Sequence, residues 1–254
     1  MSPHTLAFLV APLTFASGLV GLLHQSWQPR EELAEETRDL INRTAGLVAT
    51  MSALVLGLLI ASASNFYNTQ KSGLELVSAR AVQLDGVLRA YGPEAQPARG
   101  LLRDLISSGY EQIWQSSGGV VKVPTIEGTE TKMDAMASFL NRLRPTASET
   151  QKQLLSRAAE LFSSITDQRL LMSLQLSNSL SWPLMTILVS WTSLLFFGFG
   201  MLARVNVTTV AVMAVGAFSV ASATFLIVEL STPYGGFLRL SPDPVLMAID
   251  ALAN

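Results

Sequence analysis

The sequence predicts an all-α membrane protein with four transmembrane helices and a helical polar domain inserted between the second and the third. Only 14% of the residues are charged and the mean hydropathy is +0.38, whereas ordinary soluble domains contain roughly 25% charged residues. The charges are also segregated, since residues 1–29, 44–70, 170–203 and 205–228 contain no Asp, Glu, Lys or Arg. Each of these runs exceeds the roughly 20 helical residues that cross a bilayer core.

The first span is expected at about residues 5–23, and a cleaved signal peptide is the alternative. A retained helix is favoured because no basic segment precedes the apolar run and no clear small-residue cleavage site follows it. The other spans are expected at about 45–63, 183–203 and 205–228. Trp182 and Pro183 mark the start of the third span, since tryptophan favours the headgroup boundary and proline the first helical turn. An acidic linker, 24–44, joins the first two spans, 183–229 holds the last two, and 230–254 is a C-terminal tail.

Small residues recur every four positions along the second span and share one helix face. They are Ala49, Ala53, Gly57 and Ala61. In lipid, such a face lets two helix backbones pack closely. The sequence leaves open whether the partner is a helix of the same subunit or of another copy of the chain.

Residues 64–182 form the polar domain, with twelve basic and eleven acidic side chains. An apolar stripe at spacings of three and four, from Val77 to Tyr91, predicts a helix that Gly92-Pro93 ends. Further helices are expected at 101–113, 131–143 and 146–182, with a loop at 117–129. Only Gly73 interrupts good helix formers between residues 45 and 91, so the second span is predicted to continue unbroken into the polar domain.

Three segments resemble the bestrophin-like domain family of bacterial membrane proteins: GLVATMSALVLGLLIASA at 46–63, LDGVLRAYGPEA at 84–95 and FLIVELSTPYGGFLRLSPDP at 225–244. The family is distantly similar to bestrophins, which are homopentameric anion channels with four spans per subunit and a pore lined by the second span. The resemblance implies a homo-oligomer, a pentamer, that conducts inorganic ions, with chloride as the candidate. The second span lacks the aromatic pore neck of bestrophins. The acidic residues near 229–250, which are Glu229, Asp243 and Asp250, are too dispersed for their calcium clasp.

The resemblance also implies a bacterial plasma (inner) membrane location with the large domain in the cytoplasm. Basic residues near the spans do not decide the orientation by themselves. Four of them fall on each side of the predicted membrane: Arg30, Arg38, Arg43 and Arg204 against Lys71, Arg80, Arg169 and Arg239.

If the second span lines a pore, the face opposite its small residues is the candidate lining. Its members are Met51, Leu54, Leu58, Ser62, Asn65 and Thr69. A ring of Leu54 and Leu58 would form a dry constriction that gates by dewetting, and the hydroxyl and amide groups that follow would replace part of an ion's hydration shell. The alternative is that these leucines face lipid or the core.

Two further features carry charge near the spans. Glu229 closes the fourth span, where an ionisable group is costly unless it is paired or hydrated. It is expected either to act as a gate or proton-linked carboxylate or to cap the boundary, and Arg239 is the basic residue on the correct side to pair with it. The acidic segment 30–39 is either a cation-attracting vestibule or a solvated helix face.

The composition argues against other classes of function. The chain has no cysteine and two histidines, so no cofactor and no metal site are expected. No basic cluster with interleaved aromatic residues indicates nucleic acid, and no catalytic triad or phosphate-binding loop is recognisable. The expected partners are the lipid bilayer, further copies of the chain and small ions. An ion channel is the favoured function, a non-conducting scaffold or sensor that signals through the polar domain is the alternative, and a membrane enzyme ranks third.

Overall fold

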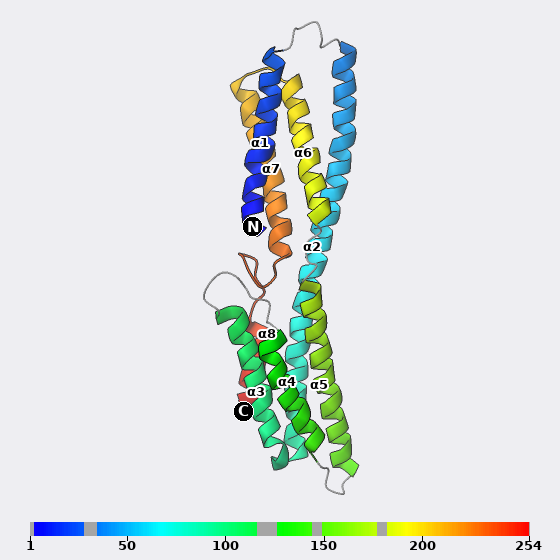
Figure 1. Cartoon of the computed structure of the whole chain (residues 1–254), viewed down its shortest axis with the longest axis vertical. Helices are drawn as coiled ribbons and strands as arrows, with labels where there is room; N and C mark the ends of the chain where they lie inside the picture. Colours follow the sequence, from blue (N-terminus) through cyan, green and yellow to red (C-terminus); the bar gives the residue numbers. More distant parts are fainter. Residues whose placement is uncertain (1–2, 28–34, 116–125, 144–148, 177–181, 254) are drawn as a thin grey trace. The chain divides into compact units, whose positions relative to one another are not determined.

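The structure, a computed structural model, describes residues 3–27, 35–115, 126–143, 149–176 and 182–253. All regular secondary structure in these ranges is helical, which confirms the predicted all-α fold class (Figure 1). The chain divides into two compact units. Unit 1 comprises Met1–Phe66 and Leu180–Ser231, and unit 2 comprises Tyr67–Ser179 and Thr232–Asn254.

Unit 1 contains α1 (Pro3–Trp27), the first part of α2 (Glu35–Tyr91), α6 (Trp182–Leu202) and α7 (Val207–Leu230). Three of these helices are long and apolar enough to cross a bilayer: α2, α6 and α7. The apolar stretch described in α1 is shorter, Leu9–His24, so the first of the four predicted spans stays a prediction. Helix α7 begins where Asn206 accepts a hydrogen bond from the backbone N–H of Thr209 at 2.7 Å, which caps the helix.

Glycines bring the backbones of α1 and α6 into direct contact. A Cβ atom added to Gly21 would collide with the carbonyl oxygen of Phe197, and one added to Gly200 would lie 2.8 Å from the backbone nitrogen of Leu22. The hydroxyl of Ser17 donates to the carbonyl oxygen of Ser193 across the same interface at 3.0 Å. Close backbone approach and a hydrogen bond between helices are the interactions that hold helices together in lipid.

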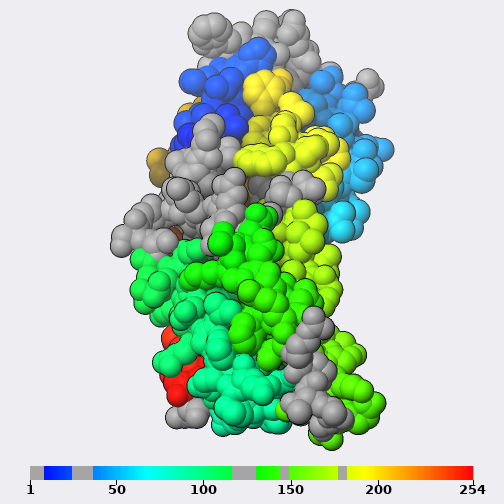
Figure 2. Space-filling model, turned by 60° about the horizontal axis from the view of Figure 1, so that its bottom comes forward, coloured from blue at the N-terminus to red at the C-terminus, as the bar shows by residue number. Residues whose placement is uncertain are grey.

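Unit 2 is built from the second part of α2 and a set of shorter helices around one apolar core. These are η1 (Pro93–Ala95), α3 (Gln96–Tyr110), the π-helix η2 (Glu111–Gln115), α4 (Ile126–Arg142), α5 (Glu149–Leu176) and α8 (Asp243–Ala253). Figure 2 shows α3, α4 and α5 side by side on one face of this unit. The core holds the predicted stripe of α2, of which Ala81 and Leu84 are fully buried.

Helix α2 is uninterrupted over 57 residues, as the lack of stop signals predicts. Gly73 does not break it. A Cβ atom there would lie 2.8 Å from Nε2 of Gln168 and 2.8 Å from Sδ of Met172, so the glycine makes room for α5. The helix ends at Gly92, whose φ of 122° is a conformation that side chains rarely adopt.

Two segments differ from the sequence-based expectation. Residues 126–129 were expected in the 117–129 loop but form the first turn of α4, while 117–125 lie outside the described residues. Residues 230–254 were expected to be a tail, but their last part forms α8. This helix buries Val245, Ala248 and Leu252, which share one face. The end of the helix expected at 146–182 also lies partly outside the described residues.

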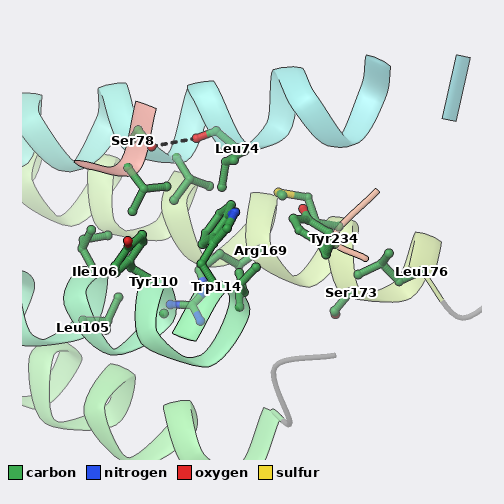
Figure 3. Close-up of a pocket in the computed structure, with 15 residues that line it drawn as sticks. Leu74, Ser78, Leu105, Ile106, Tyr110, Trp114, Arg169, Ser173, Leu176 and Tyr234 are labelled. Atoms are coloured by element: carbon green, nitrogen blue, oxygen red, sulfur yellow. Dashed lines mark hydrogen bonds between the residues drawn. The ribbon is translucent and has the colours of Figure 1, made fainter. Parts of the chain in front are cut away.

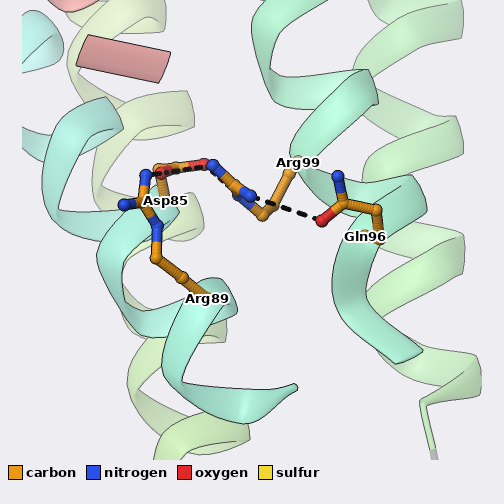
Figure 4. A network of polar contacts seen from close by, with 4 residues as sticks. All are labelled: Asp85, Arg89, Gln96 and Arg99. Atoms are coloured by element: carbon orange, nitrogen blue, oxygen red, sulfur yellow. Dashed lines mark hydrogen bonds and ion pairs between the residues drawn. The ribbon is translucent and has the colours of Figure 1, made fainter. Parts of the chain in front are cut away.

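A buried carboxylate joins α2 to α3 in unit 2 (Figure 4). Asp85 is 4% exposed, and its Oδ1 accepts a hydrogen bond from Nε of Arg99 at 2.6 Å. Its Oδ2 accepts from Arg99 at 3.2 Å and from Arg89 at 3.1 Å. The hydrogen bond to Asp85 raises the pKa of the Arg99 guanidinium. Such bidentate pairing compensates the carboxylate for its loss of water.

The glycine contact predicts that Gly21→Leu will destabilise unit 1 by at least about 2 kcal/mol, because overpacking a close backbone contact forces the helices apart. Thermal unfolding in detergent, followed by circular dichroism, measures the loss. Gly198→Leu is the matched control, because no atom lies within 4 Å of a Cβ added to Gly198 on α6. Equal stability of the two variants would contradict the close packing of α1 and α6.

The ion-pair network predicts that Asp85→Asn will cost about 3 kcal/mol, because two arginines then lose their counter-charge. Hydrogen–deuterium exchange of the α2–α3 amides should become about a hundredfold faster. Glu160→Gln is the control, since its pair with Arg157 at 3.1 Å is exposed and such pairs contribute less than about 1 kcal/mol. Identical exchange in both variants would show that the network contributes little.

Candidate functional site

The part of α2 in unit 1 packs against its own subunit along one narrow face. Ala45, Ser52, Leu59 and Ala63 are buried there. Leu59 and Ala63 belong to an apolar cluster with Met185 and Leu188 of α6 and with Ile227 and Val228 of α7. The spacing of seven, seven and four residues places this face along one line of the helix.

The residues predicted to line a pore lie outside this buried face, and all are exposed. Met51, Leu54 and Leu58 are 49%, 67% and 60% exposed. Ser62 and Asn65 follow them in unit 1 and are also exposed, as is Thr69, which belongs to unit 2. Exposed leucines of this size are unusual in a soluble protein but are expected on a surface that meets lipid or another subunit.

The small-residue face is a third surface of α2. Ala53, Gly57 and Ala61 are exposed and Ala49 is half-buried. A Cβ atom added to Gly57 would meet no atom within 4 Å. At about 100° per residue, the buried, small-residue and candidate pore faces lie roughly a third of a turn from one another. The single chain therefore covers one face of α2 and leaves two uncovered.

Two exposed leucines extend the candidate pore face and were missed by the sequence analysis. Leu40 and Leu47 are 66% and 67% exposed. They lie fourteen and seven residues before Leu54, which places all three on one line of the helix. The recurrence of leucine every seven residues could have indicated this longer face. Leu40 was not counted with the span because it belongs to the charged segment before it.

The predicted boundary charges have different surroundings. Glu229 is fully buried at the end of α7 in unit 1. Arg239 is exposed and belongs to unit 2. Their pairing stays a prediction. Burial of Glu229 to 0% exposure shows that this side chain is enclosed by the protein and does not extend into the surrounding medium.

The acidic segment is described only from residue 35 onward, so Glu31 and Glu32 lie outside the described residues. Asp39 and Arg43 form an ion pair at 3.7 Å in the first turns of α2, with side chains 72% and 82% exposed. Exposed side chains with an internal ion pair are compatible with both expectations for this segment, a solvated helix face and a vestibule of an oligomer. No cluster of three or more potential metal ligands occurs in the described part of the chain.

Unit 2 contains a cavity of about 100 Å³ that the sequence analysis did not anticipate (Figure 3). Its walls come from α2, α3, η2, α5, α8 and the segment after α7. Most lining side chains are aliphatic or aromatic, and Arg169 of α5 is the one charged residue among them. In Figure 3, Trp114 lies between Tyr110 and Tyr234, in agreement with ring-centroid distances of 5.7 Å and 6.4 Å.

Hydrogen bonds hold the aromatic walls of the cavity in place. The indole N–H of Trp114 donates to the carbonyl oxygen of Leu240 at 3.1 Å. The hydroxyl of Tyr234 donates to Oε1 of the fully buried Gln70 at 3.1 Å. The amide of Gln70 donates in turn to Oε1 of Gln175 at 2.9 Å. Because the polar atoms of Trp114 and Tyr234 have protein partners, their rings present apolar surface to the cavity.

Burial shifts the pKa of two ionisable groups at this cavity. It lowers the pKa of the Arg169 guanidinium, since a charge is less stable away from water. It raises the pKa of the Tyr234 hydroxyl, for which the ionised form is penalised. Tyr234 is therefore a neutral hydrogen-bond donor at any physiological pH.

The arrangement of the helices and the uncovered faces of α2 define an α-helical membrane protein. The chain matches the model of the family described as Bestrophin-like domain over residues 10–245 and belongs to that family. Among solved structures, a point mutant of a bacterial bestrophin homologue from Klebsiella pneumoniae is similar, with a TM-score of 0.66 and 14% identity. The match covers 97% of each chain and shows a shared fold. A comparison with curated proteins finds no match.

Proposed function

We propose that this protein forms a homo-oligomeric ion channel, a pentamer as in bestrophins, with the second transmembrane helix lining an anion-conducting pathway. Membership of the bestrophin-like family and the fold shared with a bacterial bestrophin homologue support this proposal. Bestrophins are anion channels. One observation supports α2 as the helix that lines the pore. On its exposed face, Leu54 and Leu58 are followed by the polar residues Ser62 and Asn65.

A pore-lining helix contacts its own subunit, a neighbouring subunit and the pore. The three faces of α2 correspond to these three environments. Leu59 and Ala63 pack against α6 and α7 of the same subunit. The small-residue face around Gly57 would pack against a neighbouring subunit, where its lack of side-chain bulk permits close approach. The face of Leu54 and Leu58 would then line the axis, and in a narrow pore its apolar side chains would exclude water in the closed state.

We further propose a bacterial plasma membrane location, with unit 2 in the cytoplasm. In this arrangement the hydroxyl and amide groups of Ser62, Asn65 and Thr69 follow the leucine constriction towards the cytoplasm. Neutral donors of this kind stabilise an anion without holding it as tightly as a fixed positive charge would. Glu229 is fully buried and does not belong to the proposed lining. In this proposal it caps the boundary of the fourth span and does not act as a gate.

Replacing Gly57 with leucine should disrupt the oligomer while leaving the subunit folded. The added side chain meets no atom of its own subunit within 4 Å at Cβ but would separate packed neighbours. Native mass spectrometry in detergent should show loss of the oligomer, and circular dichroism should show unchanged helix content. Gly198→Leu again serves as the control. An intact oligomer of Gly57→Leu would remove this face from the subunit interface.

Replacing Leu58 with serine should raise channel activity at least about threefold, because a hydroxyl in the constriction favours its hydration. Single-channel recording in planar bilayers measures open probability and conductance. Leu194→Ser on α6 is the matched control, since Leu194 is similarly exposed at 65% but lies on a different helix. Conductance that is present and unaffected by Leu58→Ser would show that the pore face is assigned wrongly.

Recording under a chloride gradient also tests selectivity. Current steps that reverse near the chloride potential support anion conduction, and steps that reverse near the cation potential would assign a cation channel. Folded oligomeric protein that stays silent with both wild-type and Leu58→Ser would favour the second candidate function, a non-conducting sensor. The cavity in unit 2 is the observation that favours a sensor as the second candidate, because a sensor needs a site for a ligand.

A further inference from the structure

The cavity of unit 2 has the chemical features of a binding site for a small molecule. It combines apolar walls, fixed aromatic rings and one cation. Ligand sites in proteins are mostly apolar and carry few polar groups, which determine the orientation of the ligand. The features of this cavity do not depend on whether the protein conducts ions, because every lining residue belongs to unit 2.

Arg169 provides the polar group. It is half-buried, and no hydrogen bond or ion pair of its side chain is found among the described residues. The two serines of the lining have hydrogen-bond partners within the protein. The Ser78 hydroxyl donates to the carbonyl oxygen of Leu74 at 2.9 Å, and the Ser173 hydroxyl donates to that of Leu170 at 2.8 Å. Arg169 therefore offers donors that no described residue occupies.

The position of Arg169 is also unusual within its helix. Ile165, Arg169, Met172 and Leu176 follow one another at spacings of four, three and four, so they share one face of α5. Ile165 and Met172 are buried in the core of unit 2. An apolar side chain at position 169 would continue this face without the cost of removing a guanidinium from water. Burial lowers the pKa of Arg169, and this direction is consistent with such a cost.

We propose that this cavity binds a small monocarboxylate with a compact apolar body, whose carboxylate pairs with Arg169. A guanidinium matches a carboxylate with two parallel hydrogen bonds. One arginine balances one negative charge, which favours a monoanion over a phosphate dianion. A cavity of about 150 Å³ lined by apolar side chains is known to hold benzene. At about 100 Å³ this cavity suits a smaller apolar body, such as the branched chain of isovalerate.

The rings determine what fits beside the charge. Trp114 and Tyr234 meet edge to face, and Tyr110 stacks on Trp114. The hydrogen bonds of Trp114 and Tyr234 leave these two rings little freedom to close the cavity. A small branched apolar body can pack against the rings, whereas acetate has no body to fill the space. The proposal therefore predicts selectivity for size as well as for charge.

Isothermal titration of the full-length oligomer in detergent tests the proposal with acetate, isovalerate and the neutral isovaleramide. Isovalerate should bind saturably, and acetate and isovaleramide at least about tenfold more weakly, as expected if the ion pair contributes about 1.4 kcal/mol or more. Arg169→Gln should weaken isovalerate binding to the level of isovaleramide. Arg157→Gln on the same helix is the control, because Arg157 is exposed and paired with Glu160.

A second readout uses Trp114 itself. A variant with Trp27, Trp182 and Trp191 replaced by phenylalanine retains this single tryptophan, whose fluorescence should change on binding with the same affinity. The proposal fails if isovalerate does not bind, if isovaleramide binds as well as isovalerate, or if Arg169→Gln leaves binding unchanged in a folded protein. It also fails if sodium chloride competes on equal terms, which would indicate a site for inorganic anions.

Discussion

The continuous hydrogen-bond ladder of α2 is the constraint on which the other features depend. In hydrocarbon, a helix must satisfy its backbone polar groups internally, and α2 extends this pattern from Glu35 to Tyr91. An unbroken ladder also fixes the angular position of every side chain along it. In unit 1 this position places Leu59 against α6 and α7. In unit 2 it places Gln70 beside the cavity and Asp85 beside α3.

The two units use different interactions to hold their helices. In unit 1, glycines of α1 and α6 allow backbone contact, and the hydroxyl of Ser17 donates to Ser193 between the same helices. In unit 2, apolar burial is accompanied by polar networks centred on Gln70 and Asp85. The difference agrees with their expected surroundings. The hydrophobic effect drives packing in water, whereas van der Waals contact and hydrogen bonds do so in lipid.

Features with local sequence signals were predictable, and those that depend on distant contacts were not. The charge-free runs located α6 and α7, and the absence of breakers gave the length of α2. The start of α4 was placed too late, because the glycines and proline of 117–129 suggested a loop, whereas core contacts of Met136 and Leu140 stabilise this helix. Helix α8 was missed because its burial depends on α3, far away in the sequence.

The candidate pore face was predicted from helical spacing, and exposure of its residues agrees with that hypothesis without testing it. The cavity of unit 2 was not predicted. Trp114 and Tyr234 are 120 residues apart, and nothing near either one indicates the other. Arg169 did carry a local signal, since it interrupts an apolar face of α5. A single such interruption is common on solvated helices, so only the three-dimensional surroundings give it meaning.

The phase of α2 has a consequence for how its length can change. Gly57, Leu58 and Leu59 are consecutive, yet they belong to three different faces, because each residue turns the helix by about 100°. Inserting one residue after Gly57 would turn the rest of the unit 1 part of α2 by the same angle and exchange exposed with buried positions up to Phe66. An insertion of seven residues would misalign the faces by only about 20°. Within unit 1, changes in the length of α2 are thus compatible with this architecture only in steps of about two turns.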